Sequence, residues 1–70
     1  MDARGRVGRN VRKLRMARAL SQEELAHQAD VHQAYLSGVE RGKRNASVLV
    51  LDRIAKALGV DIDRLFTRDE

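Results

Sequence analysis

The chain has 70 residues, no cysteine and a formal net charge of +4. This length fits a single domain, 1–70, with a small core at about 6–66, and the lack of cysteine excludes disulfides and thiolate metal sites as supports for that core. No apolar run approaches the roughly 20 residues that cross a bilayer, so we expect a cytoplasmic protein without a membrane segment, stabilised by association with a second copy.

Proline is absent and no alternation of apolar and polar residues is long enough for a strand, so we expect an all-α fold. The first helix is predicted at about 6–18, where Val7, Val11 and Leu14 share one face. The cations that crowd this end of the chain are Arg4, Arg6, Arg9, Arg12, Lys13, Arg15 and Arg18. They indicate either a polyanionic partner or a solvated helix face, and those before residue 10 either a minor-groove arm or solubilising charge.

The second predicted helix, at about 22–29, opens with Ser21 and Glu24, a spacing at which each side chain can cap the other's backbone N–H. The third is predicted at about 33–41. Because only residues 29–31 join the two helices, the second must cross the first steeply. The pair is therefore predicted to be a helix-turn-helix.

A fourth helix is predicted at about 48–58, capped by Ser47, and a fifth at about 62–66. Gly42 and Gly59 suit the left-handed residues that end the third and fourth helices. The sequence thus predicts a five-helix domain.

The third predicted helix has an outward face that suits base edges. Leu36 and Val39 are spaced to face the core. On the other side, Gln33 can pair with an adenine edge and Ala34 can touch a thymine methyl group. Gly38 falls near that side and costs about 1 kcal/mol in a helix interior, which close approach to DNA or a smooth packing surface would each accommodate.

Four runs carry a family resemblance: LSQEELA at 20–26, YLSGVERGKRN at 35–45, IAKALGV at 54–60 and LF at 65–66. Together they resemble the lambda-repressor-like, XRE-type helix-turn-helix family over about 6–66, and the similarity is greatest to the small controller proteins of restriction–modification systems. The resemblance implies dimerisation through the C-terminal helices and binding to palindromic operators. For a controller it also implies autoregulation and timed activation of the endonuclease gene.

The resemblance further implies which residues contact DNA. These are Gln22, His32, Gln33, Ala34, Tyr35, Ser37, Arg41, Lys43 and Arg44. Arg15 and Glu40 match an interhelical ion pair that fixes the third helix against the first. The chain departs from the family at His32, which replaces a serine or threonine cap, and at Ala19 and Asp30, where glycine is usual.

A second surface is predicted for self-association. Leu49 and Val50 lie off the main apolar stripe of the fourth helix and would be exposed in a monomer. The predicted homodimer interface comprises Leu49, Val50, Arg53, Ile62 and Phe66.

The sequence contains no pattern typical of catalysis or metal binding. His27 and His32 are the only candidate nitrogen ligands, and no nucleophile constellation or Gly-rich phosphate loop accompanies them. We therefore expect no enzyme activity, cofactor, metal or small-molecule ligand. Glu23 and Glu24 either contact RNA polymerase or serve helix capping and dipole compensation.

The sequence therefore predicts a transcriptional regulator that binds double-stranded DNA through the major groove as a homodimer. Two alternatives stay open. One is a DNA-binding antitoxin or phage-type repressor with the same motif. The other is a helix-turn-helix that bridges proteins without specific DNA binding, against which the basic residues beside the third helix argue.

Overall fold

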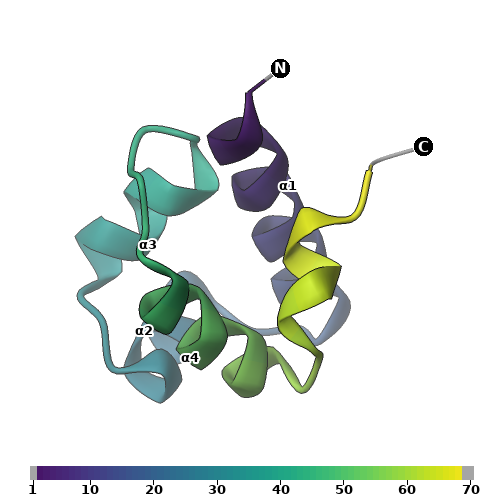
Figure 1. Ribbon diagram of the computed structural model, residues 1–70. Helices are drawn as coiled ribbons and strands as arrows, with labels where there is room; N and C mark the ends of the chain where they lie inside the picture. Colours follow the sequence, from purple (N-terminus) through teal and green to yellow (C-terminus); the bar gives the residue numbers. More distant parts are fainter. Residues whose placement is uncertain (1, 69–70) are drawn as a thin grey trace.

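Every regular element among the described residues is a helix. A computed structural model describes residues 2–68. Its elements are α1 Ala3–Ala17, α2 Gln22–Ala29, α3 Gln33–Glu40, α4 Val48–Leu58 and the 3-10 helix η1 Ile62–Phe66 (Figure 1). The all-α prediction is confirmed. The fifth predicted helix is not an α-helix, because a segment of only five residues closes as the tighter 3-10 form that is common in short pieces.

Helix α1 begins earlier than the sequence suggested. Asp2 caps it: one carboxylate oxygen accepts a hydrogen bond from the Gly5 backbone N–H at 3.1 Å. This bond, assisted by the Arg4 guanidinium, holds the pKa of the Asp2 carboxyl below its usual value. Arg6 and Arg9 are therefore helical, so this segment is not a disordered arm.

The four α-helices end in the same way, with a residue in the left-handed conformation. These residues are Ala19, Asp30, Gly42 and Gly59, with φ of 56°, 58°, 72° and 73°. At each end, two backbone N–H groups fold back onto carbonyls of the last turn, as Leu20 N does onto Arg15 O at 3.1 Å. The predicted roles of Gly42 and Gly59 are confirmed. Alanine is the costly member of the set, since an L-side chain disfavours this conformation.

The core draws on every element. Its buried apolar residues are Val7, Val11, Leu25, Ala26, Ala29, Leu36, Val39, Leu51, Ile54, Ala55, Leu58 and Leu65. Helix α1 lies between α3 on one side and η1 on the other (Figure 1). Among residues 2–68, no helix has both the length and the apolar composition that a membrane crossing requires.

Asn10 fastens the C-terminal segment to α1. Its side chain is buried, and its amide nitrogen donates to Leu65 O at 2.9 Å and to Thr67 O at 2.8 Å. Both hydrogens of the amide are thereby used, so burial leaves neither unsatisfied. A short 3-10 helix with little cooperativity of its own is held in place by this side chain and by buried Leu65.

Gly8 sets the distance between α1 and α3. A β-carbon on Gly8 would meet Val39 O, and it would come within 2.7 Å of Glu40 O. Both are backbone atoms at the end of α3, so neither can move without shifting that helix. The absence of a side chain at position 8 is therefore what allows α3 to pack against α1.

We expect Gly8→Ala to lower the free energy of unfolding by about 2 kcal/mol, the cost of overpacking a site whose neighbours are backbone. The measurement is denaturant unfolding followed by circular dichroism. Helix propensity alone would raise the free energy of unfolding, since alanine favours a helix over glycine by about 1 kcal/mol. A stabilised variant would therefore contradict the close approach of α1 and α3.

Candidate nucleic-acid interface

The connection between α2 and α3 is a tight turn of the helix-turn-helix kind. Asp30 adopts the left-handed conformation that ends α2, and Val31 N returns to Ala26 O at 2.9 Å. His32 then begins α3 with extended backbone. Within residues 2–68, its side chain accepts no hydrogen bond from the start of α3, as expected for a residue that replaces a serine or threonine cap.

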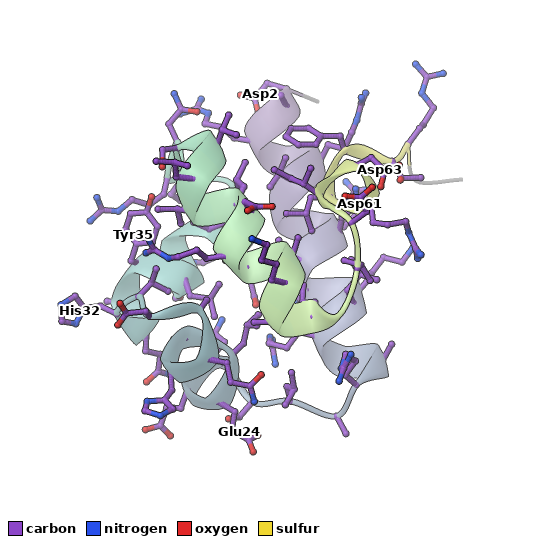
Figure 2. The ribbon with its side chains drawn as sticks, turned by 60° about the horizontal axis from the view of Figure 1, so that its bottom comes forward. Asp2, Glu24, His32, Tyr35, Asp61 and Asp63 are labelled. Carbon is purple, nitrogen blue, oxygen red and sulfur yellow. The ribbon has the colours of Figure 1, made fainter. Side chains whose placement is uncertain are left out.

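Helix α3 buries one face and exposes the other. Leu36 and Val39 are buried, as predicted, whereas Gln33 and Ala34 are exposed and Ser37 is half-buried. Figure 2 shows His32 and Tyr35 on one side of the molecule, with the labelled carboxylates Glu24, Asp61 and Asp63 away from it. The exposed residues Gln33 and Ala34 of α3 are therefore uncharged, and this side of the molecule lies apart from those three acidic side chains.

Gly38 is buried and does not face outward as the spacing suggested. The segment that follows α3 turns back over this residue. Lys43 N and Arg44 N both donate to Gly38 O, at 2.8 and 3.2 Å. A β-carbon on Gly38 would lie 2.6 Å from Arg44 Cγ, so the aliphatic stem of Arg44 covers it.

Tyr35 and Arg44 meet on the same side of α3. The guanidinium carbon of Arg44 lies 5.2 Å from the centre of the Tyr35 ring, within the range of a cation–π contact. Tyr35 is half-buried and Arg44 is exposed. The ring thus supports the cation, and Arg44 adds a positive charge to this side of α3.

Three polar side chains from three helices fix the base of α3. The Arg15 guanidinium binds Glu40 through two hydrogen bonds of 2.7 and 3.0 Å, as the family resemblance implied, and it also donates to Leu20 O at 2.9 Å. The hydrogen bonds to Glu40 raise the pKa of Arg15 above its usual value. Gln22 donates from its amide nitrogen to Glu40 at 3.1 Å. An amide nitrogen carries two hydrogens, and this bond uses one of them.

The start of α2 is a complete capping box. Glu24 N donates to the Ser21 hydroxyl at 3.0 Å, and Ser21 N donates to the Glu24 carboxylate at 2.8 Å. These bonds from Ser21 lower the pKa of Glu24. The capping role of Glu24 is confirmed.

The cations that follow α3 are held beside the first turn of α1. Arg41, Lys43 and Arg44 are all exposed. Gly42, between them, comes so close to α1 that a β-carbon would lie 3.2 Å from Gly5 Cα. The loop is therefore fixed against α1, and one of its cations, Arg44, lies over Tyr35 of α3.

The residues predicted for the dimer interface differ in exposure. Leu49 is 75% exposed and Phe66 43%, whereas Val50 and Ile62 are half-buried. The Arg53 guanidinium donates to Ala29 O at 3.0 Å and to Asp30 O at 3.3 Å. Arg53 therefore caps the end of α2 within its own chain, a role that the sequence analysis did not foresee.

An apolar groove adjoins these residues. It has a volume of about 190 Å³, and its lining includes Ala46, Val48, Leu51 and Phe66. Val48 is 70% exposed and was missed in the sequence analysis, because it fits the core-facing stripe of α4. Within residues 2–68, no three His, Asp or Glu side chains gather closely enough to hold a metal ion.

Comparison with known proteins places the chain among helix-turn-helix transcriptional regulators. The helix-turn-helix family model HTH_3 matches residues 11–65. An uncharacterised HTH-type transcriptional regulator of Sinorhizobium fredii, y4dJ, is 45% identical over 96% of this chain and 87% of its own length. Control protein C.BamHI of Bacillus amyloliquefaciens is 46% identical over 76% and 67%. The crystal structure of the restriction-modification controller protein C.AhdI from Aeromonas hydrophila superposes with a TM-score of 0.88, at 40% identity over 90% and 96% of the two chains.

We expect Glu40→Gln to lower the free energy of unfolding by about 2 kcal/mol, because it leaves a guanidinium that is only 13% exposed opposite a neutral amide. The measurement is denaturant unfolding at neutral pH. Asp52→Asn is the matched control, since it neutralises the exposed Asp52–Lys56 pair. That control should change stability by less than about 0.5 kcal/mol. Equal effects of the two substitutions would show that the Arg15–Glu40 pair does not hold α3.

Proposed function

The chain belongs to the HTH_3 helix-turn-helix family of DNA-binding transcriptional regulators, and we propose that within it the protein acts as a controller of a restriction–modification system. The observation that carries this proposal is the outward face of α3. Gln33 and Ala34 stand exposed there, and the guanidinium of Arg44 lies over Tyr35 of the same helix. This is the arrangement that major-groove recognition requires.

In the proposed complex, α3 enters the major groove with its N-terminal end against the base edges. Gln33 pairs with an adenine and Ala34 contacts a thymine methyl group. His32, Tyr35 and Ser37 extend the contact area on the same side. Phosphates are bound by Gln22, Arg41 and Lys43, which sets the register and makes affinity fall with salt, whereas Arg44 reaches a base edge.

The operator is proposed to be palindromic, since a twofold dimer presents two copies of α3. The exposed apolar side chains Leu49 and Phe66, with Val50, Ile62 and the stem of Arg53 beside them, supply the surface that a second protomer would bury. Half-sites about 34–36 Å apart then fall on one side of the duplex. Binding rather than catalysis is the inferred activity.

The biological role follows from the relatives and from the resemblance in the sequence. As a controller, the protein binds the operator of its own gene and regulates the timing of the endonuclease gene in the cytoplasm. Glu23, exposed beside the capping box, is available for a contact with RNA polymerase, whereas Glu24 is occupied in the cap. Neighbouring genes for a methylase and an endonuclease would support this role, and a toxin gene would favour an antitoxin.

The direct test is selection of duplexes from a random pool at physiological ionic strength. We expect enrichment of one palindromic sequence. Gln33→Ala should then relax the preference at one base pair of each half-site and weaken binding to the selected duplex by about tenfold. Lys43→Ala should weaken all duplexes alike and reduce the slope of log K against log salt by about 1.

Identical effects of the two variants would contradict the assignment of base and phosphate contacts. A pool from which no sequence is enriched would overturn the proposed function and favour a bridging module.

We expect Leu49→Glu to convert the dimer to a monomer in sedimentation at tens of micromolar protein and to weaken operator binding. Because Leu49 is 75% exposed in the protomer, the substitution should leave protomer stability within about 0.5 kcal/mol. Met16→Glu is the matched control, since Met16 is another exposed apolar side chain, at the far end of α1. A dimer that survives Leu49→Glu would place the interface elsewhere.

A further inference from the structure

We infer that Gly38 is a positioning residue for DNA recognition: its lack of a side chain lets Arg44 lie along α3 and present its guanidinium to a guanine edge. This inference rests on the proposed function and deepens it, since Gly38 itself touches no base. Three features that lie together support it: buried Gly38, the loop that follows α3, and the ring of Tyr35 one helical turn before Gly38.

The backbone brings Arg44 back over α3. Two successive N–H groups, of Lys43 and Arg44, converge on the carbonyl of Gly38 at 2.8 and 3.2 Å. The loop is therefore anchored to the residue that the Arg44 side chain covers. Its path is fixed by backbone bonds and not by the side chain of Arg44.

The side chain of Arg44 lies directly over Gly38. The three heavy atoms nearest to an added β-carbon at Gly38 all belong to Arg44, and the closest, Cγ, would be 2.6 Å away. Arg44 thus occupies the space of the missing β-carbon. Tyr35 lies one helical turn earlier on the same side, and its ring meets the guanidinium carbon at 5.2 Å.

This geometry has a functional use. An arginine side chain in solution samples many rotamers, and ordering it on binding costs entropy. Here the stem of Arg44 lies against α3, its guanidinium lies over a ring, and the residue as a whole stays exposed. A guanidinium held in this way can bind guanine O6 and N7 through two hydrogen bonds. The buried glycine, unfavourable in a helix interior, is explained by this placement.

The test is Gly38→Ala, which pushes Arg44 off α3 while keeping its charge. The probe is the duplex that the unmodified chain enriches most strongly from a random pool, with a scrambled duplex of the same length beside it. We expect Gly38→Ala to weaken binding to the selected duplex by about tenfold and to change binding to the scrambled duplex little. The thermal midpoint should stay equal or rise, because alanine favours a helix.

A double-substitution cycle separates positioning from a general effect. In an Arg44→Ala background, Gly38→Ala should change affinity by less than about twofold, since the group it positions is gone. The single tyrosine gives a readout without DNA. The side-chain protons of Arg44 should show upfield ring-current shifts in the NMR spectrum of the unmodified chain and lose them in Gly38→Ala.

Three results would overturn the inference alone: full binding by Gly38→Ala, a further loss in the Arg44→Ala background, or a lowered thermal midpoint, which would assign Gly38 to packing. If the unmodified chain enriches no duplex, the proposed function fails, and this inference with it.

Discussion

The orientation of α3 depends on one largely buried ion pair, between Arg15 and Glu40. Glu40 stands at the end of α3, and the Arg15 guanidinium binds it through two hydrogen bonds while Gln22 adds a third from the start of α2. These residues come from α1, α2 and α3, so the three helices are tied at one point. Because the same contact includes Gln22, the scaffold and the expected phosphate contact at the start of α2 cannot vary independently. Gly8 completes the constraint by letting the end of α3 reach α1.

Local signals in the sequence were sufficient to place most helices. The capping box at Ser21 starts α2, and Gly42 and Gly59 end α3 and α4, through contacts with residues only a few positions away. The structure has all three as predicted. What failed depends on partners far along the chain. Asn10 is an ordinary polar residue of a helix until η1 folds onto it, and Arg53 looks like a surface cation until the end of α2 lies beside it. The form of the last helix was misjudged because periodicity does not distinguish five residues of α-helix from 3-10 helix.

The candidate site shows the same division. Spacing alone gave the buried face of α3 and the exposed Gln33 and Ala34. It placed Gly38 on the outward side, because helical periodicity contains no information about a later loop. Only the fold shows that Arg44 returns to cover this residue and stacks on Tyr35. One signal in the sequence could have indicated this contact. Gly38 lies inside a predicted helix, and Arg44 follows within one turn of that helix's end.

The ends of the helices have a consequence for how this chain tolerates mutation. Two of the four left-handed residues, Ala19 and Asp30, carry a β-carbon that disfavours their conformation, the alanine more so than the aspartate. Both flank α2, and a change of one nucleotide converts a codon of either residue to glycine. Relief of about 1 kcal/mol at such a site is comparable to the damage of a typical substitution. Stabilising changes are therefore one nucleotide step away, at the two ends of α2.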